Sequence, residues 1–523
     1  MEELDKDFKK RYANFLFPSK KTKMALEKDR REIPPTTGPD VETGGAIMHD
    51  IHERLTTVPE AEIGTVRAFV AAMEKLVTVS TIQDKLARAD HINEMGRGVN
   101  LYDPETIATF PPGHHLPFRI SPNPFSLPEE LKSNIVRYGH AFAAFYKATR
   151  DVLKELPKDH RWHEYLNHSK PDFILKASEE SPYDHTFVRP DLIMTESGIL
   201  TAEIETSPFG VALSHFMDSA YRSAGQVTLK KPKMMERVFL ETIYRGGSTT
   251  QNVVFIVTDH TKKYQGQFEY LAYQMGKYGF QAEVMHIDDM LILGDTGQCI
   301  CQGRNIDIAF RGFCLYEATE DERLKALIET PTTRICPPPK PQMEEKALMG
   351  MIYDEELQGN LRARLGEHFD TLQKIIPPTF VIDGDGPPEN FPHDISRWEE
   401  LATLPKSQRK YVIKISGYDE TALWAKGLHF LHRMNQQQVR DLLTQVAQSP
   451  QTYIIQKFEK PVTVKQEYVD PETKTLKEMD GRVRITPYFY TGDGSLVTAK
   501  ATVCPPDSDK VHTRRDSVNS SVL

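Results

Sequence analysis

Three carboxylates lie close together in one short stretch of the sequence, RPDLIMTESGILTAEIETSPFG, at residues 189–210. They are Asp191, Glu203 and Glu205. The runs DLIM and ILTAEIE are apolar and β-branched, and the turn signal TESG separates them, so the stretch predicts a β-hairpin. A three-residue loop at 196–198 would pair Thr195 with Ile199 and place Asp191 opposite Glu203. Strand alternation would then put Glu205 on the same face.

Like charges so close together repel one another, so a positive partner must keep these side chains ionised. A divalent cation with oxygen ligands is the simplest partner, and we therefore expect Asp191, Glu203 and Glu205 to bind a metal. The alternative is a solvated edge hairpin, because edge strands commonly carry charge. The position of Arg189 just upstream and of the loop SPFG just downstream favours a functional site.

A lysine within an apolar strand is the second candidate. Lys414 stands in YVIKIS and is followed by a glycine-containing loop. Burial of a lysine is costly unless it meets an anion, and a phosphate that also contacts loop N–H groups is the natural one. A carboxylate partner or an exposed strand edge is the alternative. Further on, the end of the strand YIIQKFE can offer backbone groups to an adenine edge while Phe458 covers the ring.

The elements that must position these residues change character near residue 181. Residues 1–180 are predicted to be mainly helical, with the clearest periodicity at 64–89 and 128–156. Beyond them, strands and helices alternate through 252–316, which predicts a parallel, Rossmann-like unit. That unit lacks the GxGxxG turn, so the sequence does not imply a dinucleotide.

The proline-rich run CPPPKPQ at 336–342 is a plausible domain boundary. A helix over 343–357 and strands within 411–503 are expected after it, and the polar tail RRDSVNSSVL is expected to be loosely held. The predicted regions are 1–180 (helical), 181–340 (hairpin and Rossmann-like unit), 341–505 (lysine and hinge region) and 506–523 (tail).

Composition limits the classes of function. A chain of 523 residues with 39% hydrophobic residues predicts a soluble globular protein of about three domains. Its net charge of -9 argues against nucleic-acid or anionic-membrane partners, which need a basic face. No run approaches about 20 apolar residues, and the N-terminus lacks the apolar core of a signal peptide. We therefore expect a cytoplasmic protein.

Taken in order, these features resemble a known family. The hairpin acids, the Rossmann-like unit, Lys346 in EKALMGMIYDE, Lys414 in YVIKISGYDE and the strand YIIQKFEKP are similar to the circularly permuted ATP-grasp proteins, which include glutathionylspermidine synthase. The resemblance covers roughly residues 180–505. It implies a mixed α/β and α+β fold: a permuted ATP-grasp with a Rossmann-like (pre-ATP-grasp) unit, preceded here by the mainly helical N-terminal region.

The resemblance also implies ATP and Mg²⁺ as cofactors and assigns roles to residues. It gives Asp191, Glu203 and Glu205 to the metal, Lys346 and Lys414 to the phosphates, and Gln456, Lys457 and Phe458 to adenine. Position 205 is Glu where the synthase has Asn, and the added charge leaves the number of metal ions open.

The implied chemistry is carboxylate–amine ligation. A carboxylate attacks the γ-phosphate of ATP, and an amine or thiol then takes the acyl group, on small-molecule or peptide substrates. Arg189 and Arg311 are candidates, together with Lys414, for holding the phosphoryl group or the substrate carboxylate, because guanidinium binds both bidentately. Ordinary ion pairs are the alternative. Arg482 and Arg484 alternate on one face of a late strand and could line the same cleft, although solvated strand charges are the preferred interpretation.

Two other functions compete with a ligase. Pro190-Asp191 followed by Glu203-Ile204-Glu205 resembles the PD-(D/E)xK signature of metal-dependent nucleases, but the lysine is missing. The other alternative is an ATP-grasp-like module that binds nucleotide without turnover, since binding and catalytic residues largely coincide in such sites.

Overall fold

The structure is a computed structural model that describes residues 63–523, except for 208, 230–232, 240, 242–251, 278, 294–296, 423–426 and 508–510. The chain divides into two units, residues 1–84 and 85–523. Helix α5 (Ile63–Gly98) crosses that boundary and includes the helix expected over 64–89. The part of the 1–180 region that precedes residue 63 lies outside the described residues. The fold below is that of the second unit.

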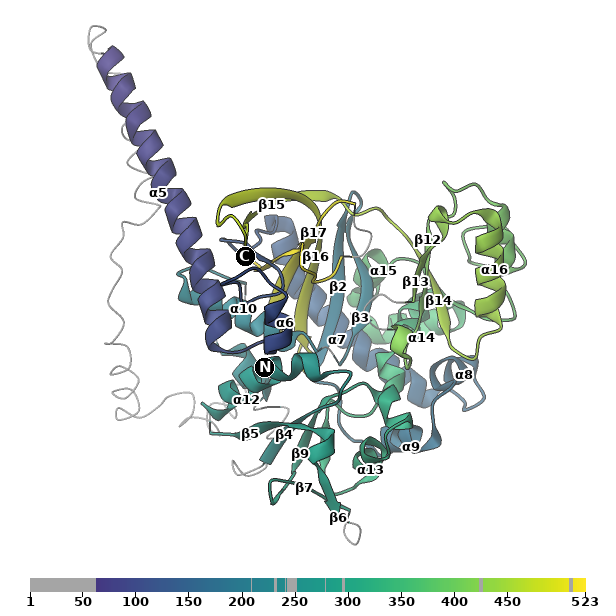
Figure 1. The fold of residues 1–523 in the computed structure, drawn as a ribbon. Helices are drawn as coiled ribbons and strands as arrows, with labels where there is room; N and C mark the ends of the chain where they lie inside the picture. Colours follow the sequence, from purple (N-terminus) through teal and green to yellow (C-terminus); the bar gives the residue numbers. More distant parts are fainter. Residues whose placement is uncertain are drawn as a thin grey trace. The chain divides into compact units, whose positions relative to one another are not determined.

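A seven-stranded sheet forms the centre of this unit (Figure 1), in the order β15-β1-β18-β17-β16-β2-β3. Its strands are β1 (Arg119–Ile120), β2 (Phe187–Thr195), β3 (Gly198–Glu205), β15 (Thr463–Val469), β16 (Leu476–Tyr490), β17 (Leu496–Cys504) and β18 (Val518–Ser521).

Helices cover both faces of the central sheet. Helix α7 (Glu129–Glu155), the helix expected over 128–156, packs on β2 and β16. Its Phe142 stacks on Phe489 of β16, with ring centroids 6.4 Å apart. The neighbouring Tyr488 and Tyr490 point the other way and pack in the core that contains α10 (Val211–Ser223). The functional side chains described below project from the face opposite α7.

A second sheet has only parallel pairs, in the order β10-β9-β4-β5. Its strands are β4 (Asn252–Val257), β5 (Gln281–His286), β9 (Ile308–Gly312) and β10 (Arg334–Cys336). Helix α12 (Gln265–Gly276) connects β4 to β5, and α13 (Glu322–Glu329) connects β9 to β10. The expected alternation of strands and helices is confirmed here. A small antiparallel sheet of β6 (Leu291–Leu293), β7 (Gln298–Cys301) and β8 (Arg304–Asn305) lies between β5 and β9 in sequence.

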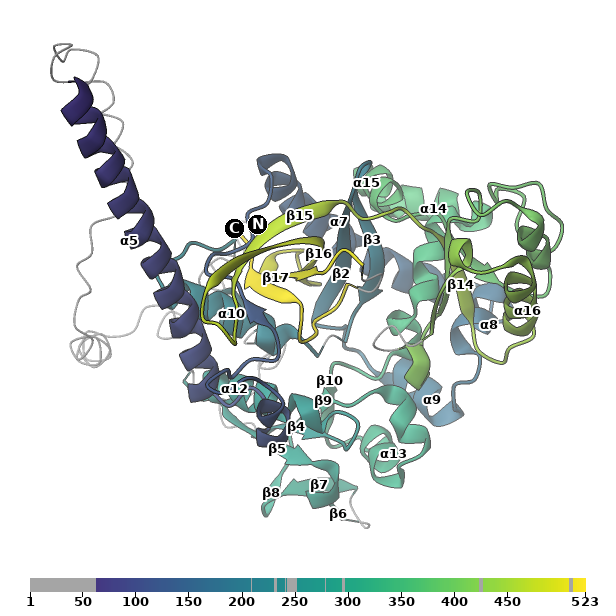
Figure 2. The same cartoon turned by 45° about the horizontal axis from the view of Figure 1, so that its top comes forward.

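A third sheet is antiparallel, in the order β11-β14-β12-β13. It comprises β11 (Thr379–Ile382), β12 (Tyr411–Ile415), β13 (Leu428–Phe430) and β14 (Tyr453–Lys457). Helix α16 (Gln436–Ala447) buries Val439 and Leu443 in one core with Ile413 of β12 and Ile455 of β14. Figure 2 shows this sheet and α16 on one side of the central sheet, and the parallel sheet below it.

The prediction of one helix over 343–357 is wrong. Two 3-10 segments, Pro341–Glu344 and Lys346–Tyr353, precede helix α14 (Glu355–Leu365). Residues 346–352 are all buried, and the extended backbone at Glu345 and Asp354 separates this segment from the 3-10 segment before it and from α14 after it. Asp354 then accepts bonds from the N–H groups of Glu356 and Leu357, and this N-cap fixes the start of α14.

The expectation of a loosely held tail is also wrong. Residues 518–521 form strand β18, which is buried. This strand pairs with β1 in parallel and with β17 in antiparallel orientation. A polar strand is stable there because its hydroxyl and amide side chains find partners: Asn519 accepts a bond from Thr502 at 2.8 Å. The remaining α-helices with described bounds are α6 (Pro104–Ala108), α8 (Arg161–Asn167), α9 (Asp172–Glu180), α11 (Met234–Phe239) and α15 (Glu367–Ile375).

None of the helices whose positions the structure describes is both long enough and apolar enough to cross a bilayer.

Candidate functional site

The hairpin β2–β3 brings the three acids to one face of the central sheet. Its loop has two residues, since Thr195 pairs with Gly198, whose φ of 121° suits glycine. The predicted three-residue loop is therefore wrong. The register shifts at Ala202, however, so Asp191 still lies opposite Glu203, and that predicted pairing is confirmed. The bulge supplies the residue that the shorter loop lacks.

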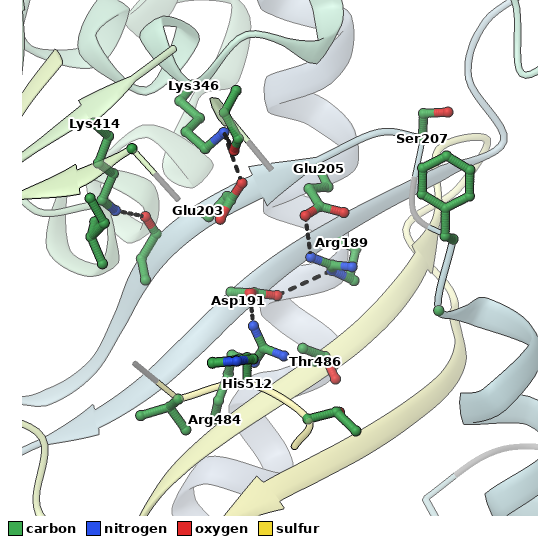
Figure 3. Close-up of a pocket in the computed structure, with 18 of the residues that line it drawn as sticks. Arg189, Asp191, Glu203, Glu205, Ser207, Lys346, Lys414, Arg484, Thr486 and His512 are labelled. Carbon is green, nitrogen blue, oxygen red and sulfur yellow. Dashed lines mark hydrogen bonds and ion pairs between the residues drawn. The ribbon is translucent and has the colours of Figure 1, made fainter. Parts of the chain in front are cut away.

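The hairpin forms one wall of a cavity of about 860 Å³, to which all three larger sheets contribute. Figure 3 shows the charged residues of β2, β3 and β16 facing the lysines across this space. Every candidate from the sequence lines the cavity: Arg189, Asp191, Glu203, Glu205, Arg311, Lys346, Lys414, Gln456, Lys457 and Phe458.

Asp191 is held between two guanidinium groups. Its Oδ1 lies 3.1 Å from Arg189 Nε, and its Oδ2 accepts a bond of 2.7 Å from Arg484 Nη1. Burial raises the pKa of Asp191, but Arg189 and Arg484 outweigh it, so the net shift is downward. Arg484 is thus an ion-pair partner within the cavity and not the solvated strand charge expected from its alternation with Arg482.

Glu203 makes an ion pair with Lys346. Lys346 Nζ lies 3.0 Å from Glu203 Oε1 and also donates to the carbonyl oxygens of Ala422 and Ser416, at 3.0 Å and 3.4 Å. Burial opposes the charge on Lys346, yet the attraction of Glu203 leaves its pKa raised. The lysine is therefore a fixed cation on the cavity wall.

Glu205 shares Arg189 with Asp191. Its Oε1 lies 2.6 Å from Arg189 Nη2. Burial raises the pKa of Glu205 to about 7; Arg189 opposes the shift, and the charges of Glu203 and Asp191 add to it. Glu205 has no cation of its own, since Arg189 also serves Asp191, and the negative charges of Glu203 and Asp191 close by favour its neutral form.

Lys414 reaches from β12 to the hairpin. Its Nζ donates to the carbonyl of Ala202, the bulged residue, and to Gln456 Oε1 at 2.7 Å. The bulge leaves that carbonyl outside the strand ladder and so supplies an acceptor for the lysine. Burial lowers the pKa of Lys414 to about 8, because neither contact is to a carboxylate.

The strand end predicted to meet adenine has mixed contacts. Gln456 is buried; it accepts from Lys414 and donates through Nε2 to Thr379 Oγ1 at 3.0 Å, so its side chain is fully engaged. Phe458 stacks on His432, with centroids 4.9 Å apart. Lys457 is half exposed and lies 3.4 Å from Glu459. The backbone and the Phe458 ring are thus the parts of this strand end best placed to meet a planar base.

Arg311 is buried at the end of β9. It forms an ion pair with Glu344 and donates to Ser207 Oγ at 2.9 Å. Glu344 in turn lies 3.0 Å from His185 Nε2. Both candidate arginines, Arg189 and Arg311, therefore have the ion-pair partners that the alternative interpretation required.

Two cavity residues are absent from the predicted site: Lys500 was not considered, and Arg484 was placed in the cleft only under the less favoured interpretation. Lys500 of β17 lies opposite Thr486, lines the cavity and donates to Thr513 at 2.7 Å and Asn519 at 3.1 Å. Burial, with Arg484 and Arg189 close by, lowers its pKa to about 7. Arg484 is the other residue. A basic residue at the inward position of each of two paired strands was the signal that could have identified both.

The acids suit a metal only in part. Within the described stretches of the chain, no three His, Cys, Asp or Glu side chains form a group that could hold a metal ion. Asp191 is already occupied by two arginines. Glu203 and Glu205 both line the cavity, and the raised pKa of Glu205 marks a place where more positive charge is stabilising. Two carboxylates suit Mg²⁺, which usually completes its shell with phosphate oxygens and water.

Comparison with known proteins adds evidence on the fold. No family model matches the sequence, and no curated protein does. A glutathione synthetase-like effector from Globodera pallida matches with a TM-score of 0.52 and 12% identity over 84% of this chain and 96% of that chain. The two chains share a fold. The mixed α/β architecture with several sheets is therefore consistent with an ATP-grasp-like fold.

A second solved structure, named as a gamma-glutamylcysteine synthetase from Methylobacillus flagellatus, matches at a TM-score of 0.38 and 12% identity. This match covers 72% of the present chain and 84% of the other. That likeness is too low to support a structural argument.

Proposed function

We propose that this protein is a Mg²⁺- and ATP-dependent ligase that activates a carboxylate as an acyl phosphate and transfers it to an amine or thiol. The observation that carries the proposal is the convergence of Lys346, Lys414 and the end of β14 with the acids of the hairpin on one cavity. Cations, carboxylates and a strand end beside an aromatic ring are the groups that phosphoryl transfer from ATP requires. The permuted element order and a Rossmann-like (pre-ATP-grasp) role for the parallel sheet belong to the same proposal.

Each part of the cavity has a role in this proposal. Phe458 and the backbone at the end of β14 bind adenine, and Lys346 and Lys414 bind the phosphates. Glu203 and Glu205 hold Mg²⁺, which would neutralise charge on the transferred phosphoryl group. Binding of phosphates would draw Lys414 from its neutral carbonyl partners towards a full negative charge, which favours its protonated form.

The guanidinium groups of Arg189 and Arg484 bind the substrate carboxylate in this proposal. Arg189 faces Glu205 and Asp191, and Arg484 shares Asp191 with it, so Asp191 fixes the orientation of both arginines. A substrate carboxylate can then bind to a fork that is already in place. Arg189 and Arg484 would raise the rate mainly by orienting the substrate carboxylate beside the γ-phosphate.

One observation favours a second function, a nucleotide-binding module without turnover. The acids carry partners from the protein itself: Glu203 has Lys346, Glu205 has Arg189, and Asp191 has two arginines. A site neutralised in this way can bind nucleotide without a complete metal shell.

The deciding experiment measures ATP binding and ADP release on the full chain. Calorimetry with and without Mg²⁺ gives the affinity for ATP, and a coupled assay follows ADP over a panel of amino acids, peptides and polyamines, offered with and without added carboxylic acids. A ligase releases ADP and phosphate only when an acid and an acceptor are both present. ATP binding with no ADP release across the panel would favour the binding module, whereas metal-dependent nicking of DNA without an ATP response would favour the nuclease alternative.

A further inference from the structure

A second pocket, of about 720 Å³, lies between residues 404–409 and the first turns of α16. None of the residues that line it lines the central cavity. It is lined by Leu404, Pro405, Lys406, Arg409, Asn435, Gln436, Gln437 and Arg440. Three of these residues are cations and none is an acid, so the pocket presents concentrated positive charge on a protein that is acidic overall.

Arg409 is the unusual member of this group. It is only 2% exposed, and its Nε and Nη1 atoms have no hydrogen-bond partner. No ion pair with any acid in the described part of the chain compensates its charge. A buried guanidinium without a counter-charge costs several kcal/mol, about as much as a broken buried ion pair. The fold therefore carries an unfavourable charge at the base of a pocket that is open to ligands.

The end of α16 adds a second attraction for an anion. This helix has 12 residues and no acid in its first turn. The side chains of Asn435 and Gln438 satisfy each other's backbone N–H groups in a capping box. The N–H groups of Gln436 and Gln437 cannot bond within the helix, so they are available to a ligand, and the helix dipole favours a negative one.

We propose that this pocket is a binding site for a phosphate group, either inorganic phosphate or the phosphate of a small phosphomonoester. Arg409 supplies a planar fork from the buried base, and the exposed Lys406 and Arg440 approach from the rim. The positive charge of three cations and a helix N-terminus is greater than a single carboxylate can neutralise. A phosphate dianion carries more negative charge and has several acceptor oxygens for these donors. The site is independent of the proposed ligase activity.

The test is calorimetric titration of the full chain with inorganic phosphate and, separately, with glycerol 3-phosphate, at constant ionic strength. We expect saturable binding that Arg440→Gln weakens about tenfold and Arg409→Met abolishes, since each substitution removes a charge-assisted contact and Arg409 forms the base of the site. Lys176→Gln, on the exposed surface of α9, is the matched control and keeps the wild-type affinity. Tighter binding of the ester identifies a phosphomonoester as the ligand, and equal or weaker binding identifies free phosphate.

Two further variants keep the outcome decisive. Because phosphate could also enter the central cavity, Lys414→Ala is titrated in parallel, and it should retain the binding described here. Arg409→Met should not lower the melting temperature without phosphate, because it removes an unpaired charge and keeps the length of the side chain. Equal phosphate affinity in the wild type and Arg440→Gln, or loss of binding in Lys414→Ala alone, would overturn the proposal. ADP release has no part in this readout, so failure here leaves the proposed ligase function standing.

Discussion

The two pockets of this protein treat buried cations in opposite ways. In the central cavity, Arg189 and Lys346 each contact a carboxylate of the hairpin. In the pocket beside α16, Arg409 forms no ion pair with an acid among the residues whose positions the structure describes. A ligand that enters the central cavity must compete with ion pairs that the protein already makes, whereas an anion beside α16 supplies a partner that is missing. The first arrangement links binding to rearrangement of side chains, and the second is open to an anion from the start.

The largest expected effect comes from breaking the central network. Asp191→Ala removes the carboxylate that the buried Arg189 and the half-buried Arg484 share and leaves two cations with Glu205 alone, so we expect it to lower the free energy of unfolding by about 3 kcal/mol. Urea denaturation at pH 7 measures this loss. Asp480→Ala, an exposed strand position, is the control and should cost less than about 0.5 kcal/mol. If Asp191→Ala lowered the free energy of unfolding as little as the control does, Arg189 and Arg484 would not depend on Asp191 as a partner. The difference in charge pairing between the central cavity and the Arg409 pocket would then have no effect on stability.

The next effect concerns turnover. Lys414→Ala removes a cation that the proposed ligase places on the phosphates, and we expect ADP release to fall at least about 100-fold. Lys465→Ala, on an exposed strand, serves as the control. Near-normal ADP release in Lys414→Ala would remove this lysine from the site.

A smaller effect is expected at the proposed metal face. Glu203→Gln should weaken Mg²⁺-dependent ATP binding about tenfold, because it removes a charged ligand. The same change at the exposed Glu478 provides the comparison. Calorimetry that finds equal ATP affinity for the two variants would contradict the assignment of Glu203 to the metal.

The smallest effect is a pH dependence. Burial holds the pKa of Lys414 at about 8, so the lysine loses its proton as the pH rises above that value. ATP affinity should then fall by up to about tenfold for each further pH unit, since phosphates bind the protonated form. Lys414→Arg stays charged and should not show this fall in ATP affinity between pH 8 and 9.5. A flat profile in the wild type would mean that Lys414 does not meet the phosphates.

Local patterns predicted the positions of the candidate residues better than their contacts. The apolar runs on either side of TESG were enough to predict the hairpin and the pairing of Asp191 with Glu203, although loop length and bulge both differ from expectation. The lone cation in YVIKIS likewise predicted a buried lysine. These predictions succeeded because strand alternation and the cost of burying a charge act within a few residues.

Contacts between residues distant in sequence explain why three of the predictions were wrong. Arg484 appeared solvated in sequence, but it meets Asp191 from a strand 293 positions further along the chain. The polar tail became β18 because β1 and β17 together offer it a place between them. Residues 343–357 did not form one helix, because the N–H groups of Lys346 and Ala347 donate to Ser416 and the backbone is extended at Glu345 and Asp354.

Strand patterns were enough to predict that the hairpin acids and Lys414 turn towards the interior, because a charge in an apolar strand is carried inward when that strand joins a sheet. The pairing of those charges follows from the tertiary structure. It placed Arg189 and Arg484 on the acid expected to bind a metal, and among the residues with a described position it gave Arg409 no acid. The physical reason is that burial follows from the local pattern of residue types, whereas pairing depends on atoms that approach within about 3–4 Å across elements distant in sequence.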